Sequence, residues 1–162
     1  MTRILIIYFS QTGNTEKMAY SVAEGVKEEG VKHQVKKVQE ASVDDLLDVD
    51  GIVIGSPTYF GTMAAEMKSF LDQSVVHFNR LKGKVGGAFA SSALLGGGNE
   101  TTVLAILQAL LIHGMIIEGT TEGGHYGPVA LGSPDQRSTE ECKQLGRRVA
   151  RLAKKLRSES AG

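Results

Sequence analysis

The stretch RILIIYFSQTGNT, residues 3–15, decides the fold that the sequence predicts. Residues 3–9 are mostly apolar and rich in β-branched side chains, which is typical of a strand buried on both faces of a sheet. Polar residues 10–14 interrupt this run, and apolar side chains then recur at helical spacing over residues 15–29. A buried strand followed directly by a helix is the repeating unit of a parallel α/β sheet.

The alternation of apolar strands and helical segments continues along the chain. Parallel strands need helical crossovers that cover both faces of a sheet, so the pattern predicts an α/β fold with a doubly wound, five-stranded parallel sheet. With 162 residues, the chain has room for one domain, residues 1–162. The further strands are expected at residues 33–38, 51–55, 85–91 and 115–118, the helices at 43–47, 64–76, 101–113 and 139–157, and a loop unit at 119–138.

The charge balance excludes several classes of partner. Lys and Arg total 18 and Asp and Glu total 18, so the formal net charge is zero. A neutral chain is not steered by bulk charge onto nucleic acid or an anionic membrane, and we expect neither as a partner. The basic run at residues 143–157 carries apolar residues at helical spacing, which indicates an amphipathic closing helix with a solvated basic face rather than a nucleic-acid site.

The single cysteine and the first residues narrow the class of protein further. Cys142 alone cannot form an internal disulfide or hold a structural metal, so no metal site is expected. The opening stretch MTRILIIYFS has an apolar run too short to span a bilayer and no cleavage pattern behind it. We therefore expect a cytoplasmic protein.

The loop after the first strand has the composition of a phosphate site. Hydroxyl groups, an amide and free backbone N–H groups at a helix N-terminus suit a phosphate dianion. The loop lacks the Gly-Lys-Ser/Thr sequence of a nucleoside triphosphate site, so one terminal phosphate is the expected ligand. The alternative is that these side chains only cap the helix. The candidate residues are Ser10, Gln11, Thr12, Gly13, Asn14 and Thr15.

Two later loops, each after a predicted strand, could complete a site for a flat ligand. The first places two aromatic side chains in a loop, where a planar ring could rest against them; the alternative is that Phe60 packs onto the core. The second has small hydroxyls and successive glycines that allow close backbone approach, or else form a flexible hinge. The candidates are Pro57, Thr58, Tyr59, Phe60 and Gly61 in the former, and Ser91, Ser92, Ala93, Leu94, Gly96 and Gly97 in the latter.

Three motifs together resemble those of the flavodoxin-like superfamily. They are S-x-T-G-N-T at residues 10–15, G-S-P-T-Y-F-G-T-M-A-A-E-M-K-S-F-L-D at 55–72 and G-G-G-N-E at 96–100. The pattern is most similar to the WrbA-type NAD(P)H:quinone oxidoreductase branch. The resemblance implies a strand order of 2-1-3-4-5, binding of the FMN phosphate by residues 10–15, and contact between the flavin ring and residues 57–61 and 92–97.

The resemblance also implies a catalytic residue and a reaction. His113 matches a histidine that reaches the flavin neighbourhood in the family and could stabilise negative charge on reduced flavin, or it could simply be favoured by the helix dipole. NADH or NADPH would reduce FMN by hydride transfer, and two electrons would pass to a quinone. The alternatives are a flavodoxin that carries single electrons between redox proteins, and a flavin-free regulatory or interaction module.

Departures from the family pattern bear on these alternatives. Zero net charge and the absence of tryptophan favour the enzyme over a strongly acidic carrier. Tyr59 stands where family members carry Arg, and two family segments that contribute to tetramer assembly are missing, so a homo-oligomer, dimer or tetramer, stays open. The family's aromatic at the substrate pocket falls near His77 and Phe78, and the roles of these two residues and of His125 stay open.

Overall fold

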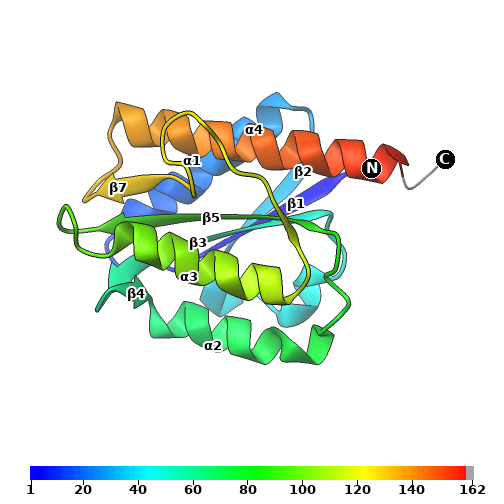
Figure 1. Cartoon of the computed structure of the whole chain (residues 1–162), viewed down its shortest axis with the longest axis horizontal. Helices are drawn as coiled ribbons and strands as arrows, with labels where there is room; N and C mark the ends of the chain where they lie inside the picture. The colour runs from blue at the N-terminus through cyan, green and yellow to red at the C-terminus, as the bar shows by residue number, and fades with distance from the viewer. Residues whose placement is uncertain (160–162) are drawn as a thin grey trace.

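Parallel strands form the central layer of the computed structural model, which describes residues 1–159 (Figure 1). Their order is β2-β1-β3-β5-β6, which is the predicted 2-1-3-4-5 order once the short antiparallel β4 is set aside. The strands of this path are β1 (Arg3–Tyr8), β2 (Lys32–Lys37), β3 (Gly51–Tyr59), β5 (Val85–Ser92) and β6 (Ile116–Ile117), and β4 (Thr62–Met63) and β7 (Val129–Leu131) join it at the side.

Helices cover both faces of the sheet, as Figure 1 shows. One layer holds α1 (Asn14–Glu28) and α4 (Gln136–Glu159), and the other holds α2 (Ala65–Gln73) and α3 (Asn99–Ile112). Successive side chains of a strand point to opposite faces, so Ile4 and Ile6 pack towards α1 and α4, whereas Leu5 and Ile7 pack towards α2 and α3. Three short 3-10 helices, η1 (Val38–Glu40), η2 (Val43–Leu46) and η3 (Ser74–His77), complete the described elements.

Two predicted loops contain strands. The strand expected at residues 51–55 continues to Tyr59 and folds back through β4 as a hairpin. The loop unit expected at 119–138 contains β7, which pairs with the carboxyl end of β5, whereas β6 pairs with its first residues. The fifth position of the sheet is therefore shared by two short strands.

The basic face of α4 lies against acidic residues of α1. Lys143 pairs with Glu24 at 2.8 Å, and Arg151 pairs with Glu29 at 2.7 Å. Surface ion pairs of this kind contribute little each, but they account for the basic run as a helix-helix contact. Cys142, on the inner face of α4, is fully buried, and burial raises the pKa of its thiol to about 12, so the thiol stays protonated and unreactive.

Residues 1–159 contain neither a membrane-spanning helix nor a cluster of metal ligands. None of the helices combines the length and apolarity needed to cross a bilayer. No group of three or more His, Cys, Asp or Glu side chains in that range is placed to hold a metal ion.

Glycines let α1 and α4 approach to backbone contact. A Cβ atom on Gly146 would lie 2.1 Å from the carbonyl oxygen of Val22, and one on Gly25 would lie 2.0 Å from that of Lys143. Both positions are in helix interiors, where glycine is intrinsically unfavourable. The close helix crossing is therefore the physical reason for these glycines.

We predict that Gly146→Ala destabilises the protein by about 1–3 kcal/mol, because the new methyl group must push the helices apart. Helix propensity alone favours alanine by about 1 kcal/mol, so the sign separates packing from propensity. Urea unfolding followed by circular dichroism measures the change. Lys155→Ala, on the exposed side of α4, is the matched control and is expected to change stability by less than about 0.5 kcal/mol. Equal or greater stability of Gly146→Ala would contradict the prediction.

Candidate functional site

The three loops singled out by the sequence meet at one edge of the sheet. β1 pairs with β3 and β3 pairs with β5, all in parallel, so their carboxyl ends lie together. In Figure 1 this is the edge at the left, where β5 leads into α3 and β4 folds back. The strand order reverses between β1 and β3, and ligands of doubly wound sheets bind at such a switch point.

The first loop, residues 10–13 with the start of α1, leaves backbone donors free. Gly13 precedes α1 in a left-handed conformation with φ of 93°, and no side chain caps the helix. Ser10 Oγ accepts the Gly13 N–H at 3.1 Å, and within residues 1–159 the side chains of Thr12 and Asn14 make no hydrogen bond. The structure therefore argues against mere capping, and the N–H groups of the first turn are available to an anion.

The side chains of Thr15 and Ser91 lie beneath the site and do not line its surface. Both side chains are buried, and their hydroxyl oxygens lie 2.9 Å apart. This contact joins the first turn of α1 to the end of β5. The structure therefore turns two of the predicted binding hydroxyls inward.

The second loop is a two-residue hairpin turn between β3 and β4. Thr58 pairs with Met63 and Tyr59 pairs with Thr62, so Phe60 and Gly61 form the turn, with φ of 49° and 81°. The Phe60 side chain is 110% exposed, and the alternative in which it packs onto the core is wrong. Its ring is thus presented outward at the carboxyl edge.

The third loop packs against this turn. A Cβ atom on Gly98 would lie 2.7 Å from Gly61 Cα, and Thr101 Oγ1 donates to the Gly61 carbonyl at 2.9 Å. Thr102 Oγ1 donates to Thr58 Oγ1 at 3.0 Å. Gly98 therefore serves a close contact between the two loops.

Gly98, Thr101 and Thr102 were missed as site residues, although the run G-G-G-N-E-T-T offered a signal. Two of them are hydroxyl residues in the first turn of a helix that begins at the site edge. The predicted residues of this loop lie on the open side: Ala93, Leu94, Gly96 and Gly97 are exposed, and Ser92 Oγ donates to the Leu94 carbonyl at 3.0 Å.

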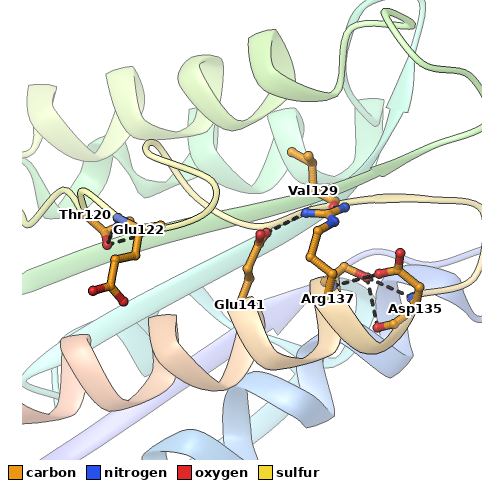
Figure 2. A network of polar contacts seen from close by, with 7 residues as sticks. Thr120, Glu122, Val129, Asp135, Arg137 and Glu141 are labelled. Carbon is orange, nitrogen blue, oxygen red and sulfur yellow. Dashed lines mark hydrogen bonds and ion pairs between the residues drawn. The ribbon is translucent and has the colours of Figure 1, made fainter.

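A polar network holds β7 beside the site edge (Figure 2). Arg137 on α4 donates to Glu141 Oε2 at 2.8 Å and to the Val129 carbonyl at 3.1 Å. Asp135 accepts the Ser138 N–H at 2.8 Å at the start of the same helix, and the Ser138 hydrogen bonds lower the pKa of the Asp135 carboxyl. This end of the sheet is therefore anchored to α4 rather than left as a free loop.

Residues 5–98, which span the first two loops and most of the third, match the sequence profile described as Flavodoxin domain. The chain belongs to the flavodoxin family.

Relatives that carry two different protein names align with most of this chain. A protein of Archaeoglobus fulgidus named "NAD(P)H dehydrogenase (quinone)" is 38% identical over 190 aligned residues, covering 96% of this chain and all of the relative. A protein of Aquifex aeolicus named "Flavodoxin" is 40% identical over 159 aligned residues, covering 93% of this chain and 86% of the relative. The crystal structure of a flavodoxin, WrbA-like protein from Agrobacterium tumefaciens superposes with a TM-score of 0.83 and 27% identity, covering 96% and 99% of the two chains.

Within this flavodoxin-family chain, His113 lies away from the other predicted site residues. It follows the 14-residue α3, which begins at the glycine loop and extends about 21 Å towards the opposite edge. Shortly after it, Ile116 pairs with Val85 at the start of β5. Within one chain, therefore, His113 lies away from the loops at the carboxyl edge, and its catalytic role stays a prediction.

The surroundings of His113 fix its protonation. Ser74 Oγ donates to the Leu71 carbonyl at 2.6 Å, so His113 Nε2, 2.7 Å away, donates to Ser74 Oγ. Its Nδ1 is buried without a partner. Burial, with a smaller contribution from the charge of His77, lowers the pKa of His113. A neutral histidine of this kind supports the packing between α2 and α3.

Within residues 1–159, none of the three side chains whose roles stayed open makes a hydrogen bond or ring contact with residues 10–13, 57–61 or 91–98. His77 contacts Asp44 Oδ1 through Nε2 at 2.8 Å. The Phe78 ring lies 6.5 Å from that of His113. His125 Nδ1 lies 3.0 Å from the Thr120 carbonyl, inside the loop between β6 and β7.

We predict that Phe60→Asn stabilises the free protein by about 1 kcal/mol, because a bulky residue is strained at positive φ and asparagine tolerates that conformation. The side chain is fully exposed, so its removal sacrifices no buried surface. Thermal and urea unfolding measure the change. Phe78→Asn is the matched control, since Phe78 is an exposed phenylalanine with an ordinary φ of −54° and is expected to gain nothing. If both variants shift alike, the strain at Phe60 is absent.

Proposed function

We propose that residues 1–162 form one FMN-binding domain that reduces quinones with electrons from NADH or NADPH. The observation that carries this proposal is the uncapped start of α1 lying beside the outward-facing hairpin at Phe60. When bound, FMN would supply a ring that accepts a hydride from NAD(P)H and passes two electrons to the quinone. With one proton from water, NAD(P)H and quinone become NAD(P)⁺ and hydroquinone.

The residues present fit FMN at both of its ends. The backbone N–H groups of the first α1 turn, with Ser10, Thr12 and Asn14 beside them, suit one phosphate dianion. Tyr59 and Phe60 offer aromatic surface for the ring, and the glycine loop approaches the same turn through Gly98. In this arrangement the chain's residues bind the phosphate, orient the ring and shield part of it from water.

The quinone reductase assignment draws support from relatives and from charge. The Archaeoglobus fulgidus relative carries that activity in its name and is matched along its whole length. The formal charge of zero and the absence of tryptophan distinguish this chain from strongly acidic carriers. A quinone-type small molecule is therefore the proposed partner at the ring end, and the cytoplasm is the proposed location, without nucleic-acid or membrane partners.

A one-electron carrier is the second candidate, and the alignments with the two relatives support it. The alignment with the Archaeoglobus fulgidus protein runs over 190 residues, longer than this chain, so that relative has segments with no counterpart here. The Aquifex aeolicus protein named "Flavodoxin" aligns over 159 residues with little need for gaps. The partner would then be a redox protein rather than a quinone.

We predict that the FMN-loaded protein oxidises NADH or NADPH in the presence of benzoquinone.

We also predict that Asn14→Asp lowers the affinity for FMN at least about ten-fold, because a carboxylate would face the phosphate. Riboflavin, which lacks the phosphate, is expected to bind the variant as it binds the original protein. Flavin fluorescence quenching measures both affinities. Asn14→Ala, which removes the amide without adding charge, is the matched control and is expected to lose less.

Two results would decide between the candidates. An FMN-loaded protein that oxidises neither nucleotide with benzoquinone, yet holds a stable one-electron-reduced flavin during stepwise anaerobic reduction, is the carrier. A colourless protein that does not quench flavin fluorescence would exclude both and leave a flavin-free module.

We also propose that the chain forms a homo-oligomer through an apolar surface at the other edge of the sheet. A groove of about 500 Å³ lies between α2 and α3. Val75, Phe78 and Ile112 line it and are 65%, 52% and 73% exposed. Exposed apolar side chains gathered at one groove are a feature of interaction sites, and a two-fold pairing would cover the same surface on both copies.

We predict that Ile112→Glu converts the oligomer to a monomer, because a carboxylate would be buried in the apolar contact. Light scattering coupled to size-exclusion chromatography at micromolar concentration measures the mass. Leu95→Glu, at an exposed leucine on the opposite edge, is the control and is expected to leave the mass unchanged. A monomeric original protein would contradict the proposal.

A further inference from the structure

One side chain joins the two loops that would hold opposite ends of a flavin. The Tyr59 hydroxyl, at the end of β3, donates to Gln11 Oε1 in the first loop at 2.9 Å, across 48 residues of sequence. The Tyr59 ring also packs edge-on against Phe9, with ring centres 6.3 Å apart at 80°. The hairpin of residues 58–63 is thereby tied to the loop of residues 10–13.

The hairpin is tied on its other flank as well. Gly61, two residues after Tyr59, is held by the Thr101 hydroxyl and the close approach of Gly98. That flank has a second hydroxyl contact, from Thr102 to Thr58. Within residues 1–159, the Tyr59 flank has a single side-chain hydrogen bond, whereas the other flank has two. Of the two ties, the one to Gln11 is therefore the easier to release.

We propose that Tyr59 is a positioning residue, whose hydrogen bond to Gln11 latches the hairpin against the phosphate-side loop and so sets how tightly the ring end of a flavin is held. This inference rests on the proposed FMN site. A latched hairpin presents Phe60 in place before binding, so less conformational freedom is lost when a ring settles against it.

The chemistry of Tyr59 and Gln11 suits a hydrogen bond that stays formed at neutral pH. Partial burial and the nearby charge of Glu66 raise the pKa of Tyr59, so its hydroxyl stays a proton donor at neutral pH. In the free protein the bond is exposed and contributes little to folding. A ligand that covers it excludes water, and a hydrogen bond in such surroundings becomes stronger. The tie therefore holds the hairpin in place before binding and becomes stronger once a ligand covers it.

The test is Tyr59→Phe, which keeps the ring and removes only the hydroxyl. We expect its affinities for FMN and for riboflavin to fall together by about five-fold, the share of one hydrogen bond. The two flavins should lose equally because the latch acts at the ring end, which they share. The urea unfolding midpoint of the free protein should not change. Tyr20→Phe, an exposed tyrosine on α1 whose hydroxyl makes no hydrogen bond within residues 1–159, is the matched control.

A double-mutant cycle identifies the partner. If Tyr59 acts through Gln11, then Gln11→Ala and Tyr59→Phe together weaken riboflavin binding no more than either change alone. Additive losses would overturn the latch. So would a loss confined to FMN, an unchanged affinity in Tyr59→Phe, or a lower unfolding midpoint that accounts for the weaker binding. If the original protein binds neither flavin, the proposed function fails, and that result is separate from all of these.

Discussion

Parallel pairing of β1, β3 and β5 is the constraint on which the rest of the structure depends. Each parallel step needs a crossover, so helices cover both faces and the strands are buried on both sides. The same pairing brings three carboxyl ends to one edge. Residues 10–13, 58–63 and 92–98 are therefore neighbours in space although they are far apart in sequence, and the site is a consequence of strand direction more than of any one motif.

The sequence predicted those structural features that have a strong local sequence pattern. Apolar runs identified the long strands, and the S-Q-T-G-N-T loop identified the free helix N-terminus at Gly13. Two features lacked such a signal. β7 has three residues, too few for a periodic pattern. The hairpin turn has Phe60 at a position where asparagine, aspartate or glycine is usual, so only Gly61 hinted at it.

Resemblance located His113 in the sequence but could not place it in space. The residue before Gly114 is fixed by the end of α3, and α3 extends away from the site for its whole length. The apolar residues of α3 likewise did not show which side of the helix would be buried. Leu107 and Leu110 face the core, whereas Leu111 and Ile112 are exposed, and Ile112 lines the groove between α2 and α3. Periodicity identifies a helix, but its buried arc depends on how the helix docks.

Residues 59–61 of the hairpin combine backbone strain with hydrogen bonds to neighbouring segments. Phe60 has positive φ and buries nothing in return, so the turn itself does not account for its conformation. The neighbours supply the missing stabilisation: Tyr59 is held by Gln11, and Gly61 is held by Thr101. Gln11 lies in the loop between β1 and α1, and Thr101 lies in the first turn of α3, so both partners adjoin elements that are anchored in the core. The strained aromatic is therefore maintained by the rigid sheet below it, which is the arrangement expected where a fold holds a side chain ready for a ligand.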